Sequence, residues 1–405
     1  MRMPALLIAA ATALALAAPA YAKTIAVAAG DGAQSRLQEA LIVAVPGDVV
    51  QLGAGRFVLT DGLSLDVKGV TVRGAGMDAT VLDFSGQKGA GEGLLVTSDE
   101  VTLRDFAVEN TKGDGIKSKG ADNIVYYRLR VAWTGGPKET NGAYGIYPVS
   151  RTGVLVDGCK VSGASDAGIY VGQSKAITVR YNYVEQSVAG IEIENSTRAD
   201  VYSNTATRNT GGILVFDLPN LPVMGGGNVV IERNLVTGND TPNFAPKGNI
   251  VAGVPRGTGV MVMANDGVWV RDNRIADNPT AQVLVIAYPQ PFTDKTYNPL
   301  PRDIVAHLDP TATLVALGDE AGLLALFALG DALRPGAAAL VAALGSALRH
   351  PLPVLTWPLV GGLIYMSAIS NLVAMLFYGY GIKRIGPMQA SVKANRAGPA
   401  EARAR

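Results

Sequence analysis

The sequence predicts an all-β solenoid in which short strands of successive coils stack into parallel sheets. Three observations predict it. A glycine followed by alternating apolar residues recurs along the middle of the chain, a second strand-like segment follows each copy, and asparagine recurs at one position of that segment. A repeat unit of about 20 to 50 residues is typical of solenoids, since one unit cannot bury its apolar face alone.

The first repeated element alternates with period 2 and is therefore predicted to be a strand. Steps between its first six glycines are 22, 30, 23, 22 and 22 residues, and the last step is 47, which is two periods or one period plus insertions. The copies begin at Gly93, Gly115, Gly145, Gly168, Gly190, Gly212 and Gly259.

The second repeated element is also predicted to be extended, because it alternates and is rich in Val, Ile and Tyr. Its copies begin at Val101, Ile124, Val154, Ile177, Ala199, Val229 and Val268. Asparagine occupies one equivalent position in four of them, and Cys159 occupies it in an earlier copy. We expect these side chains, Asn182, Asn204, Asn234 and Asn273, to bond one another in a ladder at a turn.

One stretch has helical periodicity. The segment from Ser35 places Leu37, Ala40, Leu41 and Ala44 on one face. With Ser35 as its expected N-cap, this helix is predicted to cover the open end of the first coil.

Both ends of the chain differ from the repeats. Residues 1–22 have the pattern of a signal peptide, with Arg2 before an apolar run and a small-residue cleavage site at Ala20–Ala22, which predicts export to the periplasm or cell envelope. The solenoid is expected over 23–305, followed by an Ala/Leu-rich helical segment (306–350), an apolar candidate transmembrane helix (351–382) and a basic tail (383–405). Membrane contact through this tail is the prediction; a buried helical hairpin, or a tail acquired by fusion or frameshift, is the alternative.

Composition excludes several classes of function. The net charge of +1 argues against a nucleic-acid partner, and one cysteine and two histidines leave no multi-cysteine or multi-histidine metal centre.

Counting from each glycine separates inward from outward positions. Ile146, Ile169, Ile191 and Ile213 are predicted to point inward. Outward positions form two neighbouring rows that we expect to be exposed: Lys117, Tyr147, Tyr170, Glu192, Leu214 and Met261, and beside them Lys119, Val149, Gly172, Glu194, Phe216 and Met263. Ser150, Gln173, Asn195 and Asp217 lie beyond them.

These rows hold the candidate site. Paired carboxylates suit proton transfer or a cation, and tyrosine rings suit sugars. The catalytic candidates are Glu192, Glu194, Tyr170 and Asp217, and the substrate-binding candidates are Lys117, Lys119, Tyr147, Gln173, Asn195 and Lys247. The sequence assigns no cofactor with certainty, and calcium is the one considered: Glu192, Glu194 or Asp217 could hold it. A solvated face with a few cross-strand pairs is the alternative.

Insertions interrupt the repeat near residues 134–144, 217–227 and 241–257, and we expect them either to wall a groove or to be tolerated additions. Lys138, Lys247 and Arg256 give them basic character that suits an acidic glycan. Asp166, in the sequence SDAG, is interpreted as a turn residue at the strand edge.

The segments NGAYGIYPV, SGASDAGIYVGQ, AGIEIENS, TGGILVFDLP and DTPNFAPKGNI resemble exported bacterial repeat proteins of the right-handed parallel β-helix, pectate-lyase-like class. That family has a firm fold and no settled activity, and its fold hosts lyases, epimerases, polygalacturonases and adhesins. The chain departs from these enzymes, since its repeats lack the histidine motif of alginate epimerases and the paired aspartates of polygalacturonases.

The resemblance implies an exported β-helix protein that binds or processes polysaccharide, an acidic glycan in particular, as a lyase, epimerase or hydrolase. Whether it is an enzyme stays open. The alternative is a non-catalytic envelope module, structural or with a protein partner.

Overall fold

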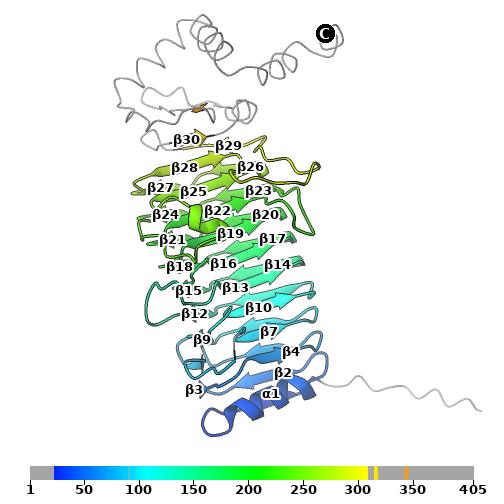
Figure 1. Cartoon of the computed structure of the whole chain (residues 1–405). Helices are drawn as coiled ribbons and strands as arrows, with labels where there is room; N and C mark the ends of the chain where they lie inside the picture. The colour runs from blue at the N-terminus through cyan, green and yellow to red at the C-terminus, as the bar shows by residue number, and fades with distance from the viewer. Residues whose placement is uncertain (1–21, 90, 309–313, 318–342, 345–405) are drawn as a thin grey trace, which may run out of the picture.

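The computed structural model describes residues 22–89, 91–308, 314–317 and 343–344. Its strands stack as parallel coils from the N-terminal helix at one end of the solenoid to β30 near the other (Figure 1). Each coil passes through three sheets in turn, which we name A, B and C. The predicted all-β parallel solenoid is therefore confirmed over these residues.

Within each sheet, every strand is hydrogen-bonded to the corresponding strand of the next coil. Sheet A comprises β1 (Thr24–Val27), β2 (Val49–Leu52), β5 (Thr71–Arg73), β8 (Thr102–Arg104), β11 (Ile124–Tyr127), β14 (Thr152–Asp157), β17 (Lys175–Arg180), β20 (Thr197–Tyr202), β23 (Gly227–Glu232), β26 (Asp266–Arg271) and β29 (Val305–Ala306). Sheet B comprises β3 (Gly55–Val58), β6 (Thr80–Asp83), β9 (Ala107–Glu109), β12 (Arg130–Ala132), β15 (Lys160–Ser162), β18 (Tyr183–Glu185), β21 (Thr205–Thr207), β24 (Leu235–Thr237) and β27 (Arg274–Ala276). Sheet C comprises β4 (Leu63–Leu65), β7 (Leu94–Val96), β10 (Ile116–Lys119), β13 (Tyr144–Val149), β16 (Ala167–Gly172), β19 (Ala189–Glu194), β22 (Gly211–Phe216), β25 (Thr258–Met263), β28 (Ala281–Ile286), β30 (Leu314–Leu317) and β31 (Ala343–Leu344).

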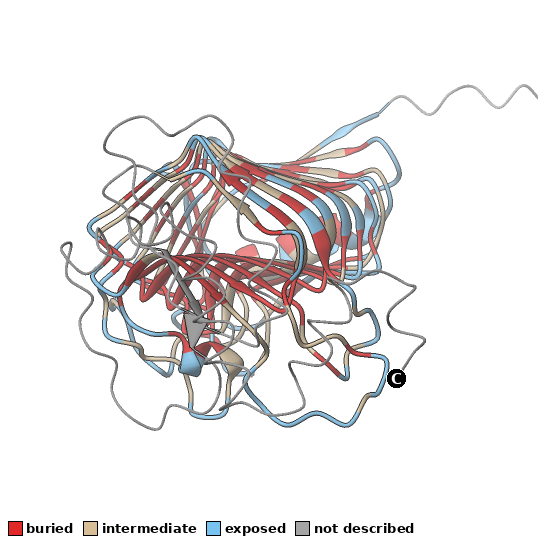
Figure 2. Ribbon diagram, turned by 90° about the horizontal axis from the view of Figure 1, so that it is seen from above, coloured by how far each residue is buried: buried red, intermediate tan, exposed pale blue. Residues whose placement is uncertain are grey.

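The glycine-led repeats are the strands of sheet C, and the second repeated element supplies sheets A and B with the asparagine turn between them. Ile213 pairs directly with Val260, so the step of 47 residues is one period plus insertions. The inward prediction is confirmed, because Ile146, Ile169 and Ile191 are fully buried in the core. Seen along the coils, buried residues line the space that the three sheets enclose (Figure 2).

Two ladders of asparagine run along the turns. In the predicted one, Asn182 Nδ2 donates to Asn204 Oδ1 at 2.9 Å, and the same bond joins Asn204 to Asn234 and Asn234 to Asn273, each at 3.0 Å. The backbone N–H of Cys159 donates to Asn182 Oδ1 at 2.8 Å, which ends the ladder. A second ladder, which sequence analysis missed, lies between sheets B and C and comprises Asn209, Asn239 and Asn278.

Helix α1 (Ala33–Val43) packs against β1, β3 and β4 at the N-terminal end of the solenoid. Leu37, Ala40 and Leu41 are buried, as predicted. The predicted N-cap is wrong: the helix begins two residues before Ser35, and its N-cap is Gly32, whose φ of 71° is left-handed. Glycine adopts that conformation at little cost, so no side-chain cap is needed for the chain to turn into the helix.

The expectations for the ends of the chain mostly lie outside the described residues. These are the signal peptide, the candidate membrane span at 351–382, the basic tail and most of the helical segment 306–350. Within that segment, β30 pairs with β28 and β31 pairs with β30, so these six residues extend sheet C, whereas helix was expected at 343–344. Across the part of the chain that the structure describes, no helix has the length and apolar character needed to cross a membrane.

The repeated glycines allow close packing of sheet C against the next coil, which gives a first prediction. A Cβ at Gly190 would lie 2.5 Å from the carbonyl oxygen of Gly212 and 2.9 Å from Asn209 Nδ2. We expect Gly190→Ala to lower the free energy of unfolding by about 1–3 kcal/mol, since the backbone must shift. Gly253→Ala is the matched control, because a Cβ there meets nothing within 4 Å. Equal denaturation midpoints for the two variants would contradict this account.

Candidate functional site

The outward rows of sheet C are aligned as the sequence predicts. Lys117 pairs in register with Tyr147, Tyr170 with Glu192, and Glu192 with Leu214. The expected exposure is wrong, however. Glu192 is 1% exposed, Glu194 6% and Tyr170 4%.

Burial arises because later segments fold over the outer face of sheet C. Residues 241–257, between β24 and β25, and residues 287–304, between β28 and β29, contribute apolar side chains to a second hydrophobic cluster outside the coil interior. It joins Leu214, Phe216, Met261 and Met263 of the sheet to Val251, Val254 and Tyr297 of these segments. The insertion at 241–257 therefore forms a roof over the sheet, and the segment 287–304 is a further insertion that sequence analysis did not identify.

Three carboxyl groups meet under the edge of this roof. Asp166 immediately precedes β16, and Glu192 and Glu194 lie two residues apart on the outward face of β19. The Glu192 carboxyl is within hydrogen-bonding reach of both Asp166 and Glu194, and no N–H or hydroxyl group of the described residues donates to Glu192 Oε2. We call Asp166, Glu192 and Glu194 the carboxyl cluster.

The carboxyl cluster holds protons at neutral pH. Burial raises the pKa of Asp166 to about 7, and the neighbouring charge of Glu194 adds to the effect. Burial likewise raises the pKa of Glu194 to about 7. The pKa of Glu192 lies well above its ordinary value because the side chain is buried between two other carboxyl groups. The cluster therefore combines protonated and ionised carboxyl groups near pH 7, and its protons titrate as those of a coupled set.

Tyrosines adjoin the carboxyl cluster on the side toward the N-terminal coils. Tyr170 donates its hydroxyl hydrogen to Glu194 Oε1 at 2.6 Å. The ring centroids of Tyr144, Tyr147 and Tyr170 are 4.4 to 4.9 Å apart. Tyr170 is buried, whereas Tyr144 and Tyr147 are half-buried and present part of their rings to solvent. The phenols thus connect the buried carboxyl groups to the accessible part of the face.

Acidic groups outnumber basic ones around the site. Lys117 lies over the Tyr147 ring at 4.9 Å, and its Nζ contacts Glu92 at 2.8 Å and Asp114 at 3.3 Å. Its charge is therefore already matched. None of the ion pairs formed by the described residues neutralises the carboxyl cluster, whose potential repels an anionic sugar.

The other predicted site residues have side chains that form no hydrogen bond with the carboxyl cluster. Asp217 accepts hydrogen bonds from the backbone N–H groups of Gly225 and Gly226, and its charge raises the pKa of Glu194. Asn195 is buried and bonds the backbone of Leu218 and Val223, so both side chains brace the loop after β22. The structure places the three remaining candidates as follows. Gln173 lies at a turn beside β16, and Lys119 and Lys247 are exposed lysines.

Sequence analysis missed three residues of the site. Asp166, interpreted as a turn residue, is 4% exposed and accepts a hydrogen bond from Asn249 Nδ2 at 3.1 Å. Tyr144 also bonds Asp166 and contacts both other tyrosine rings. Asp166 and Tyr144 were detectable from their positions beside the repeated strands, but Asn249 lies 83 residues from Asp166 and gave no such signal.

Within the described ranges, no group of three or more histidine, cysteine, aspartate or glutamate side chains is arranged to hold a metal ion. The calcium expectation stays a prediction.

Known proteins share this architecture. A family model described as "Right handed beta helix region" matches residues 68–223. The chain is similar to that family over these residues, and the described structure has the parallel β-helix fold that the sequence resemblance implied. No curated protein matches the sequence.

Several solved structures are similar in fold. The A-module of the mannuronan C-5 epimerase AlgE6 from Azotobacter vinelandii is 17% identical, with 71% of this chain and 82% of that chain covered and a TM-score of 0.43. A mannuronic acid specific polysaccharide family 6 lyase from human gut microbiota is 13% identical, with 82% and 78% covered and a TM-score of 0.44. The catalytic unit of a GH87 α-1,3-glucanase from Streptomyces thermodiastaticus is 17% identical, with 75% and 54% covered and a TM-score of 0.42.

The raised pKa values predict how stability depends on pH. Asp166 and Glu194 have pKa values of about 7 in the folded protein against 3.8 and 4.5 ordinarily, so the folded state binds more protons between these limits. The contribution of these protons to the free energy of unfolding is fully present below about pH 4 and is lost as the pH rises through 7. We expect the melting temperature to fall by several degrees between pH 5 and 8. Each kcal/mol lost from the free energy of unfolding lowers it by on the order of 2–4 °C. The double variant Glu192→Gln, Glu194→Gln should show a flatter profile, and an unchanged slope would contradict the assignment.

Proposed function

We propose, from this site rather than from the likeness to other β-helix proteins, that the protein binds a polysaccharide on the outer face of sheet C and hydrolyses its glycosidic bonds. The observation that carries the proposal is the carboxyl cluster, which is buried beside a group of tyrosine rings and forms no ion pair with a basic side chain of the described residues. Such a cluster is costly to bury, and strongly perturbed carboxyl groups of this kind are found preferentially at catalytic sites.

Glycoside hydrolysis needs one protonated carboxyl group and one ionised carboxylate. With pKa values of about 7, Asp166 and Glu194 supply both forms at neutral pH. One protonates the oxygen of the departing sugar as the C–O bond breaks, and the other removes a proton from the attacking water. Glu192, hydrogen-bonded to both, stores the proton between turnovers.

The accessible parts of Tyr144 and Tyr147 offer an apolar surface on which a sugar ring can stack. The surrounding Glu92, Asp114 and cluster carboxyls favour a neutral sugar at the point of cleavage, rather than the acidic sugar expected from the basic insertions. Of those insertion residues, Arg256 is ion-paired with Asp240 at 2.6 Å. Asn249 donates to Asp166 at 3.1 Å, and a substrate that bonds Asp166 has to displace it. Asn249→Ala is therefore expected to lower KM.

A panel of neutral and uronate-containing polysaccharides tests the proposal. Hydrolysis of a neutral glycan creates new reducing ends without the ultraviolet absorbance of unsaturated sugars. Absorbance from a uronate substrate would instead indicate a lyase and refute hydrolysis. If no polysaccharide yields reducing ends or is retarded in affinity gels, a structural or protein-binding role in the envelope replaces the proposal.

A further inference from the structure

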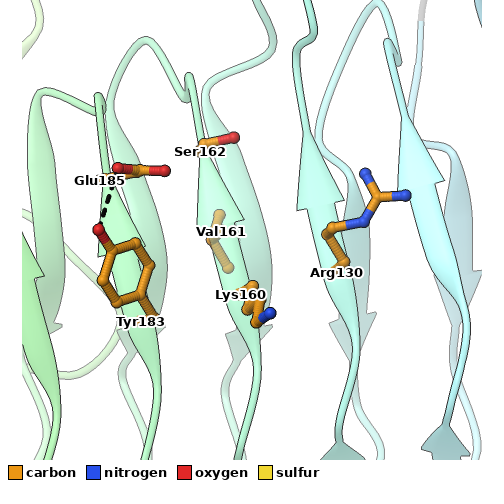
Figure 3. Close-up of a pocket in the computed structure, with 6 residues that line it drawn as sticks. All are labelled: Arg130, Lys160, Val161, Ser162, Tyr183 and Glu185. Carbon is orange, nitrogen blue, oxygen red and sulfur yellow. Dashed lines mark hydrogen bonds between the residues drawn. The ribbon is translucent and has the colours of Figure 1, made fainter. Parts of the chain in front are cut away.

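A cavity of about 320 Å³ lies on the outer face of sheet B, away from the carboxyl cluster. Figure 3 shows its lining, which comes from three neighbouring strands, β12, β15 and β18. Arg130, Lys160 and Tyr183 form one row in register across these strands, and Ser162 and Glu185 are paired beside it. This volume lies at the lower end of the range of small-ligand sites, about 300–1,000 Å³.

The cavity contains an unmatched positive charge. Arg130 is neutralised by Glu109 at 2.7 Å and Asp78 at 3.3 Å. Lys160 is exposed and has no ion pair or hydrogen bond from its ammonium group to any described residue. Like charges directly opposite each other on adjacent strands are unfavourable, so an anion beside Lys160 would relieve the repulsion from Arg130.

The remaining groups suit a ring that carries hydroxyl groups. Tyr183 is fixed in position, because its hydroxyl accepts a hydrogen bond from Arg208 at 3.0 Å and donates to Glu185 at 3.3 Å (Figure 3). Its half-buried ring offers a surface to the C–H face of a sugar. The Ser162 hydroxyl bonds no other described side chain and can bond a sugar hydroxyl. Glu185 is ion-paired with Arg208 through Oε2, the atom that Tyr183 also contacts, and its Oε1 can accept from a second sugar hydroxyl.

We propose that this cavity binds a single uronate unit, with its carboxylate at Lys160, its ring against Tyr183 and its hydroxyl groups at Ser162 and Glu185. A free ammonium, a free hydroxyl and a positioned phenol within one cavity match the carboxylate, hydroxyls and apolar face of such a sugar. The site is on another sheet from the carboxyl cluster, so it does not depend on the proposed hydrolysis.

Calorimetric titration of the full chain with glucuronate and with glucose tests this site. We expect glucuronate to bind more tightly than glucose, and less tightly as salt is added. Lys160→Gln should weaken glucuronate binding at least about tenfold and leave glucose binding unchanged, because a charge-assisted hydrogen bond is lost. Tyr183→Ala should weaken both.

Lys175→Gln is the matched control, since Lys175 is an exposed lysine on sheet A. Melting curves confirm that each variant is folded. Glu194→Gln should bind glucuronate as the unmodified protein does, which separates this site from the carboxyl cluster. No glucuronate binding, equal binding by Lys160→Gln, or loss of binding in Glu194→Gln would each overturn the proposal.

Discussion

Glu194→Gln is expected to lose at least about a hundredfold of the proposed polysaccharide-hydrolysing activity while remaining folded. General acid–base catalysis by one side chain typically contributes 10²- to 10⁴-fold, and glutamine can neither donate an acidic proton nor accept one. Because Glu194 has a pKa of about 7, a large fraction of it is protonated at neutral pH, and the neutral amide is a close replacement for that form in the buried site. The rate of reducing-end release, with a melting curve of the same sample, measures both effects.

A second substitution distinguishes a catalytic role of Glu194 from a general effect on the folded structure. Tyr170→Phe removes the hydroxyl that donates to Glu194 Oε1, a bond that holds the pKa of Glu194 down. The pKa of Glu194 should therefore rise, and the pH profile of kcat should shift toward alkaline pH. Glu100→Gln is the control, because that glutamate is 53% exposed and pairs with Lys68. An inactive Glu100→Gln, or a Glu194→Gln variant of full activity, would rule out this role for the cluster.

Asn204→Leu is expected to lower the free energy of unfolding by about 3–6 kcal/mol. Asn204 Oδ1 accepts from the N–H and the Nδ2 of Asn182, and Asn204 Nδ2 donates to Val179 O and Asn234 Oδ1. Leucine fills a similar volume but removes these four hydrogen bonds, at about 0.5–1.5 kcal/mol each, and takes away the acceptor of the buried Asn182 N–H, at about 1–3 kcal/mol. Asn182 Nδ2 keeps its bond to Val156 O, and Asn234 Oδ1 keeps its bond from the Asn204 N–H. Equilibrium denaturation measures the loss.

The control for the ladder is Thr178→Leu on the outward face of sheet A, where Thr178 is half-buried. Exposed substitutions usually change stability by no more than about 0.5 kcal/mol. If Asn204→Leu had the same free energy of unfolding as this control, the asparagine ladder would only result from the stacking of the coils and would not stabilise them.

The sequence by itself determined the solenoid, its register and the direction of its side chains. These follow from local rules, since period-2 alternation assigns each residue of a strand to one face, and a step of 22 or 23 residues from Gly145 to Gly168 to Gly190 aligns neighbouring coils. Asn204 and its counterparts were predictable for the same reason, because identical positions in stacked coils are neighbours. The second ladder obeys this rule too, because Asn209, Asn239 and Asn278 recur at the same short distance after Asn204, Asn234 and Asn273.

Only the tertiary structure decided what covers the outward face. Glu192 and Glu194 point away from the coil interior, as the alternation requires, yet residues 241–257 and 287–304 fold back over them. No repeat pattern encodes where such insertions pack, because their contacts join segments tens of residues apart. That roof removes water from the carboxyl groups and so raises the pKa values of Asp166 and Glu194 to about 7. Alternation thus fixed that Glu192 and Glu194 share the face, and long-range packing of the insertions joined them with Asp166 in a proton-holding cluster.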